Sequence, residues 1–387
     1  MYDFDTLVDR RNSDAVKWRA NSACHSSVYD EVIPMWIADM DYAAPPEVTA
    51  ALKERAEHAV YGYTSAPEEL YRAYILWMKK RHNTEVKRDW LSFSPGIVPA
   101  VASAIRAFSS RGEGIAITPP VYHPFKRLIE ANDRVTVEAP LVFNAGRYEL
   151  DLDALDKACS KSRLFILCSP HNPVGRVWNK AELQAIAEIA NKHKTIVFAD
   201  EIHGDLVYEK GLMLPSFGIK ELYPLLISAW APSKTFNIAG LQASIISVPD
   251  EKLMAALQKE NEKLGHSSPN CMAPHAAAIA YNNGAAWLDE ALVYMKGNYE
   301  LLCKGLARNA PAIRVSPMEG TYLAWLDFRQ AGLTGDVNSE LIERAGLWLD
   351  SGSRFGTNGD GFARLNLGCP RYLVEEAVKR LGAAFGS

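Results

Sequence analysis

The sequence has few cysteines, and they do not cluster. Its 387 residues include six, and no two of them have C-x-x-C spacing. They are Cys24, Cys159, Cys168, Cys271, Cys303 and Cys369. A disulfide framework or a zinc site usually shows closer and more regular spacing. We therefore expect a reduced, cytoplasmic enzyme without a metal site.

Long apolar runs and a surplus of positive charge are also missing. No stretch reaches the roughly 20 apolar residues of a membrane span. Residues 1–18 carry charges among the first five and no apolar run, so we expect neither a signal peptide nor a membrane anchor. The 42 basic and 46 acidic residues give a net charge of -4, whereas nucleic-acid-binding proteins usually carry a basic excess. A small molecule is the expected partner.

No nucleotide-binding motif appears either, since the chain has no Walker sequence and no G-x-G-x-x-G between a strand and a helix. From about residue 90, short apolar runs alternate with stretches of helical period. This alternation is typical of a mainly parallel sheet flanked by helices. We predict strands at 114–120, 163–170, 195–202 and 225–230, and a helix that begins after Asn179.

The length and the changing pattern predict an α/β protein of more than one domain. Residues 46–285 are expected to form a large α/β domain, and residues 286–387 a smaller α+β domain. Residues 1–45, rich in turn signals, are expected to pack against the smaller domain.

Polar residues stand where the predicted strands end, which is where parallel sheets present ligand sites. Asp200 ends an apolar strand, and a buried carboxylate there needs a cation or several donors; a helix cap or an arginine pair is the alternative. Its neighbour Glu201 is expected to face outward. His203 could donate to a ligand or be a core histidine.

Two further strand ends offer an amide and an aromatic ring. Pro173 holds Asn172 in an extended conformation, so the Asn172 amide could face a ligand oxygen; a turn asparagine is the alternative. Tyr122 could stack on a flat ligand or simply pack.

Residues 92–108 run from a strand through Gly96 into a helix. The free N–H groups near Gly96, Ile97 and Val98 favour a phosphate, although a plain strand-to-helix turn has the same pattern. Lys234 follows another apolar strand, and burying its ammonium without a partner is costly.

Taken together, these features match a phosphorylated pyridine aldehyde. The lysine would form a Schiff base, and the carboxylate would keep the ring nitrogen protonated.

Three motifs carry a family resemblance: Asn172 in HNPVG, Asp200 in ADEIH and Lys234 in PSKTFNIAGL. In order and spacing they resemble the fold-type I pyridoxal-phosphate enzymes of the class I and II aminotransferase family. A narrower set is similar to the cystathionine β-lyase, or cysteine-S-conjugate β-lyase, subgroup. It consists of MYDFDTLVDRR, PMWIADMDY, YGYT, DEIHGD, TYLAWLDF and GFARLNLGCPR.

The resemblance implies roles for the predicted residues. Lys234 would be the Schiff-base lysine, with Asp200 at the pyridine nitrogen and Asn172 at the ring hydroxyl. Tyr122 would stack on the ring, and Arg364 would clamp the substrate carboxylate. The implied phosphate contacts are Gly96, Ile97, Val98, Ser233 and Tyr63, the last reaching in from a second identical subunit.

The sequence departs from the common aminotransferase pattern at three positions. Gln242 stands where many members have a phosphate-binding arginine, and Ala231 where a serine is common. His203 replaces a common tyrosine, in agreement with the β-lyase subgroup, and is expected beside the cofactor. We therefore expect cofactor affinity to depend more on Tyr63 and on helix N–H groups.

The resemblance implies a homodimeric lyase that eliminates a thiol from cystathionine, cysteine or an S-substituted cysteine, leaving pyruvate and ammonia. One alternative is an aminotransferase that passes the amino group to a 2-oxo acid. An alternative of another class is a regulatory protein that keeps this fold and binds a transcription factor. The intact set of Lys234, Asp200, Asn172 and Arg364 argues against a purely non-catalytic role.

Overall fold

The computed structural model describes residues 1–19, 25–265, 268–333 and 335–386, so Cys24 lies outside the described residues. A seven-stranded sheet has the order β2-β10-β9-β8-β7-β3-β4. Its strands are β2 (Leu91–Ser94), β10 (Ser244–Ser247), β9 (Leu226–Trp230), β8 (Ile196–Asp200), β7 (Ser162–Cys168), β3 (Gly114–Ile117) and β4 (Val135–Glu138). From β9 to β4 every pairing is parallel, while β10 runs antiparallel to both neighbours. The predicted mainly parallel sheet is confirmed.

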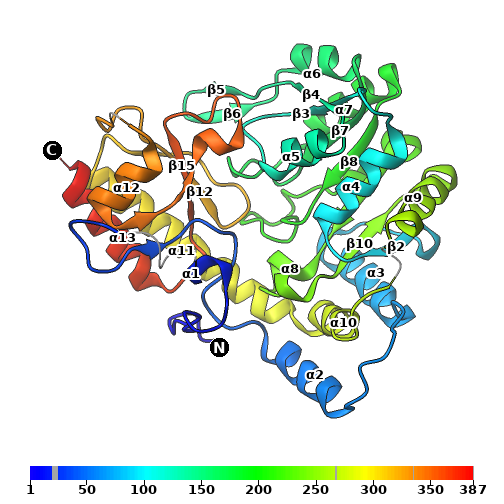
Figure 1. Cartoon of the computed structure of the whole chain (residues 1–387), viewed down its shortest axis with the longest axis horizontal. Coiled ribbons are helices and arrows are strands. Elements are labelled where there is room, and N and C mark those ends of the chain that lie inside the picture. The colour runs from blue at the N-terminus through cyan, green and yellow to red at the C-terminus, as the bar shows by residue number, and fades with distance from the viewer. Residues whose placement is uncertain (20–24, 266–267, 334, 387) are drawn as a thin grey trace.

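Helices cover both faces of this sheet (Figure 1). Leu164 and Ile166 of β7 share a core with α4 (Ile97–Phe108), α5 (Pro124–Ala131) and α9 (Glu251–Leu264). Their neighbours Phe165 and Leu167 join the opposite core. That core holds residues of α3 (Glu68–His82), α6 (Leu152–Cys159), α7 (Lys180–His193) and α10 (Ala273–Asn283). Alternate side chains along one strand therefore hold two helical layers.

The local sequence signals explain the element boundaries. Asn179 caps α7 by accepting from the Glu182 amide, and the Glu182 side chain accepts from the Asn179 amide. The predicted strands are confirmed, but β3 and β7 end earlier than their apolar runs, before Pro119 and Pro170. Proline lacks the N–H that a sheet ladder needs.

A second sheet lies beside the first, near the C-terminus (Figure 1). It has the antiparallel order β11-β12-β15-β14, made of β11 (Arg314–Val315), β12 (Leu323–Asp327), β15 (Phe362–Asn366) and β14 (Asp350–Ser351). Residues of α11 (Ala285–Asn309), α12 (Val337–Ala345) and α13 (Arg371–Phe385) complete its core. The N-terminal β1 (Ile33–Pro34) pairs with β13 (Leu347–Trp348) of this region. The domain limits at 45/46 and 285/286 stay predictions.

The remaining α-helices and β-strands of the described residues are short or lie at the edges. They are α1 (Val16–Arg19), α2 (Pro46–Glu57), β5 (Val142–Asn144), β6 (Arg147–Glu149) and α8 (Pro232–Thr235). Among the described residues, no helix has the length and apolar character needed to cross a membrane.

The expectation that Glu201 faces outward was wrong, because the side chain is fully buried. Its carboxylate accepts hydrogen bonds from the Ser216 amide and hydroxyl, from the Ser228 hydroxyl at 2.5 Å and from Trp230 Nε1 at 2.9 Å. Burial raises the pKa of this carboxyl. The donors come from β9 and from residues 216–218, so the short-range sequence around Glu201 could not reveal them.

Replacing this carboxylate is expected to destabilise the protein. Glu201→Ala leaves the Ser216 amide and the Ser228 hydroxyl buried without their acceptor, so we expect a loss of about 3 kcal/mol or more in the free energy of unfolding. Thermal and denaturant unfolding would measure it, with the exposed Glu188→Ala on α7 as control. Equal midpoints for the two variants would contradict the buried network.

Candidate functional site

A cavity of about 440 Å³ opens where the carboxyl ends of the central strands face the smaller sheet. Every predicted cofactor or substrate residue except Tyr63 lines it. These residues are Gly96, Ile97, Val98, Tyr122, Asn172, Asp200, His203, Ser233, Lys234 and Arg364. The structure therefore brings together ten positions that are up to 268 residues apart, from 96 to 364.

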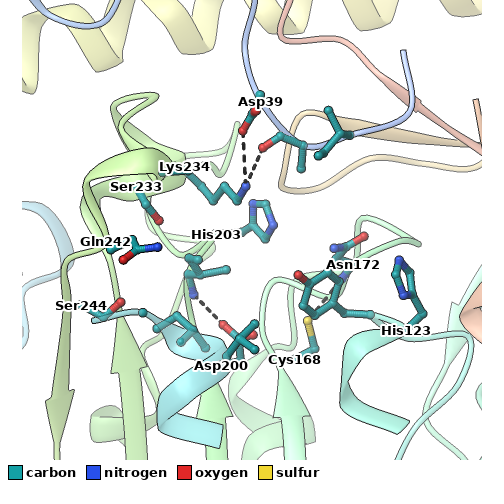
Figure 2. Close-up of a pocket in the computed structure, with 18 of the residues that line it drawn as sticks. Asp39, His123, Cys168, Asn172, Asp200, His203, Ser233, Lys234, Gln242 and Ser244 are labelled. Carbon is teal, nitrogen blue, oxygen red and sulfur yellow. Dashed lines mark hydrogen bonds and ion pairs between the residues drawn. The ribbon is translucent and has the colours of Figure 1, made fainter. Parts of the chain in front are cut away.

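Lys234 points into this cavity from the short helix α8 (Figure 2). Its Nζ donates to the Ala38 carbonyl at 2.6 Å and lies 4.0 Å from Asp39 Oδ1. Burial lowers the pKa of the amine, as does the Arg364 charge, while Asp39 acts in the opposite direction. A lysine with a lowered pKa is more readily deprotonated, which favours a nucleophile or a base.

Asp200 ends β8 on the floor of the cavity (Figure 2). Its Oδ1 accepts one hydrogen bond, from the Ile202 amide at 3.1 Å. Burial raises the pKa of the carboxyl from 3.8 to about 7. A nearby cation would lower this pKa again, so a protonated ring nitrogen fits the position chemically.

Arg364 on β15 and Asn172 are held together by a hydrogen bond. Arg364 Nη1 donates to Asn172 Oδ1 at 2.8 Å, and Nη2 donates to the Trp36 carbonyl and to Asp350 Oδ2, both at 2.8 Å. The Nε of Arg364 is buried and has no partner among the described residues. A guanidinium fixed in this way could bind a carboxylate in one orientation.

Two further predicted side chains, those of Tyr122 and His203, line the same cavity. Tyr122 follows β3 with its ring partly buried, and the pKa of its phenol is raised, first by burial and then by the Asp200 charge. His203 is buried, and burial lowers the pKa of its imidazole to about 3. His203 Nδ1 has no hydrogen-bond partner in the described part of the chain. The histidine is therefore neutral and has a free ring nitrogen at the cavity wall.

The opposite end of the cavity has the features of an anion site. Gly96 has φ +155°, a conformation that suits glycine, and directly precedes the first turn of α4. Ser233, Gln242 and Ser244 lie together on one side of Lys234 (Figure 2). The Ser244 Oγ is buried without a described partner. This set of donors fits a phosphate even though Gln242 brings no charge.

Tyr63 does not reach the cavity of its own chain. It lies in the segment between α2 and α3, and its side chain is fully exposed. Its expected contact with the cofactor of a second subunit stays a prediction.

The structure adds lining residues to which the sequence analysis gave no role in the site. They are Trp36, Asp39, His123, Cys168, Ser244, Asp350 and Arg354, among others. The motif PMWIADMDY, which carries Trp36 and Asp39, was a signal of resemblance without an assigned role. Nothing in the local sequence marks the others.

The model of the family "Aminotransferase class I and II" matches residues 30–381, which is most of the chain. The chain belongs to the class I and II aminotransferase family. One relative of this chain is the cystathionine beta-lyase PatB of Bacillus subtilis. The two sequences are 35% identical over an alignment that covers 98% of this chain and 99% of PatB.

Two solved structures have the same fold. Cystalysin from Treponema denticola, which contains pyridoxal 5'-phosphate, has a TM-score of 0.94 and 34% identity over 99% of this chain and 98% of its own. The PLP-bound C-S lyase from Staphylococcus hominis has a TM-score of 0.93 and 30% identity over 100% of this chain and 99% of its own. The expected fold-type I architecture of pyridoxal-phosphate enzymes is confirmed.

The raised pKa of Asp200 gives a pH-dependent stability in the cofactor-free protein. Between 3.8, the pKa ordinary for the unfolded chain, and about 7, the folded state binds more protons at this carboxyl. Its contribution to stability is therefore lost as the pH rises through that range. We expect the advantage of wild type over Asp200→Asn to shrink between about pH 4.5 and about pH 7.5.

Melting temperatures of the two cofactor-free proteins, measured in parallel, check this expectation. Burial lowers the pKa of His203 to about 3 and that of His123 to about 4, so both stay neutral across this range and do not contribute to the difference. A difference that stays constant across the range would contradict a raised pKa at Asp200.

Proposed function

We propose that the chain is a pyridoxal-phosphate-dependent carbon-sulfur β-lyase. The observation that carries this proposal is the meeting of Lys234, Asp200 and Arg364 in one cavity. The two solved relatives and the cystathionine beta-lyase PatB favour a lyase over an aminotransferase.

The cavity fits the cofactor at each of its ends. Asp200 would hold the protonated ring nitrogen, Asn172 the ring hydroxyl, and Tyr122 the ring face. His203 would lie beside the ring with its free Nδ1. Gly96, Ile97, Val98 and Ser233 would hold the phosphate. When bound, pyridoxal phosphate supplies an aldehyde for the substrate amine and an electron sink for the charge left at Cα.

The chain's own residues provide the positioning and the proton transfer. Arg364 binds the α-carboxylate and so fixes the plane of the substrate. Lys234 removes the Cα proton, for which its lowered pKa is suited. The bond from Cβ to sulfur then breaks and the thiol leaves. Overall, an S-substituted cysteine and one water give the thiol, pyruvate and ammonia.

A second copy of the chain would complete the site. The segment between α2 and α3 exposes Val60, Tyr61 and Tyr63, which is unusual for apolar side chains so close together. We propose that this segment packs on a second subunit and carries Tyr63 to the partner's phosphate site.

The described cysteines are all free thiols, which supports a reduced, cytoplasmic environment.

The lyase assignment predicts pyruvate without an amino acceptor. Purified enzyme given cystathionine or an S-alkyl cysteine should release equal amounts of thiol and pyruvate with no 2-oxo acid added. Coupled lactate dehydrogenase and thiol reagents measure the two products.

Lys234→Ala serves as the matched negative control. It should bind the cofactor loosely and turn over negligibly, and borohydride should fix the cofactor to the wild-type protein only. If turnover requires a 2-oxo acid and yields its amino acid, the chain is an aminotransferase.

Arg364→Lys tests the carboxylate clamp. The variant keeps the charge but loses the planar fork, so kcat/KM should fall by roughly two orders of magnitude, or about 3 kcal/mol. Cofactor absorbance and circular dichroism should stay near wild type. Near-normal turnover would leave Arg364 with a purely structural role.

A further inference from the structure

A second cavity, of about 290 Å³, adjoins the first. Tyr122, His123 and Arg354 line both cavities, so the two spaces meet at these side chains. Four more charged residues line the second cavity: Lys126, Arg127, Glu130 and Glu138. A substrate that enters the first cavity therefore has a charged extension of the site beside it.

Arg354 stands at the junction and shares one carboxylate with Arg364. Arg354 Nη1 donates to Asp350 Oδ1 at 2.6 Å, and Arg364 Nη2 donates to Asp350 Oδ2 at 2.8 Å. Two guanidinium groups thus face one carboxylate, which leaves one positive charge in excess. Arg364 is buried, whereas the Arg354 side chain is 46% exposed. A guanidinium has five N–H donors, so Arg354 retains donors beyond its bond to Asp350.

The other charges of the second cavity are unevenly paired. Glu138 is 3.4 Å from Lys126 Nζ and accepts a hydrogen bond from Thr357. Arg127 is exposed and has no hydrogen bond or ion pair among the described residues. Glu130, also exposed, is the remaining carboxylate of the wall. Two arginines therefore have donors free for an anion.

His123 lines both cavities together with Arg354 and is uncharged. Burial is the main cause that lowers the pKa of its imidazole to about 4, and the charges of Arg354 and Arg127 act in the same direction. A neutral imidazole can donate one hydrogen bond without adding charge.

We propose that Arg354 and Arg127 form a subsite for a carboxylate at the far end of the substrate's leaving group. The preferred substrates are then S-substituted cysteines with an acidic substituent. This inference rests on the proposed lyase function. Arg364 takes the α-carboxylate in the first cavity, and the substituent on sulfur extends past Tyr122 and His123 toward Arg354. A neutral alkyl substituent gains no charge-assisted hydrogen bond there.

A matched pair of substrates tests the subsite. S-(2-carboxyethyl)-L-cysteine and S-propyl-L-cysteine differ only by a carboxylate in place of a methyl group. Wild type should favour the acidic substrate by about 10-fold or more in kcat/KM, the scale of one charge-assisted hydrogen bond. Arg354→Gln should remove most of this preference, and Arg127→Gln part of it.

Arg344→Gln is the control, because Arg344 also pairs with a carboxylate four residues away and is 39% exposed. It lies on α12 outside both cavities and should keep the wild-type preference. If Arg354→Gln lowers kcat/KM equally for both substrates, the subsite is overturned, because Arg354 then acts only by holding Asp350.

Binding gives a readout that does not depend on elimination. The probes are 2-aminopimelate and 2-aminoheptanoate, which have no leaving group and again differ by a carboxylate in place of a methyl group. Calorimetry should show tighter binding of 2-aminopimelate to wild type and only a small remaining preference in Arg354→Gln.

The turnover and binding experiments test the subsite and the lyase assignment separately. If no thiol is released from either cysteine derivative but the Arg354-dependent binding preference persists, the lyase assignment fails and the subsite stands. If both cysteine derivatives release thiol, and 2-aminopimelate and 2-aminoheptanoate bind equally well, the lyase assignment stands and the subsite is overturned.

Discussion

The site depends on the main-chain carbonyls of four consecutive residues, 36–39. Arg364 donates to the Trp36 carbonyl, and Asn366 donates to the carbonyls of Ile37 and Asp39. Lys234 and Tyr322 both donate to the Ala38 carbonyl. Lys234 belongs to the large sheet region, whereas Arg364 and Asn366 belong to β15. One extended stretch of backbone therefore fixes the lysine relative to the arginine. Buried donors of this kind need acceptors, and here the acceptors are peptide groups.

Much of the architecture could be predicted, because its determinants are local. The apolar runs of the central strands and the Asn179 cap of α7 act over a few residues, and each predicted strand and the cap are present, although three of the strands end early. Asp200, Asn172 and Lys234 could be grouped for a related reason. Parallel strands bring their carboxyl ends to one edge, so a polar residue after each strand reaches the same cavity.

The rest could not be predicted because its partners are distant in sequence. The Ala38 carbonyl and Lys234 are 196 residues apart, and nothing in the sequence near either residue indicates that they form a hydrogen bond. Glu201 is buried because Ser228 and Trp230 supply donors from the next strand. The same holds for Arg354, whose importance depends on sharing Asp350 with Arg364. A main-chain carbonyl acceptor gives no signal in the sequence, because every residue has one.

The stacking of Trp36 on Trp348 has an optical consequence. The two ring centroids are 5.1 Å apart with planes inclined by 11°, and Trp36 also lines the cavity. An indole at this position can transfer excitation energy to a chromophore held beside it. The protein thus carries a native fluorophore at the wall of the site, and a chromophore bound in the cavity would lower the emission of this one of its nine tryptophans.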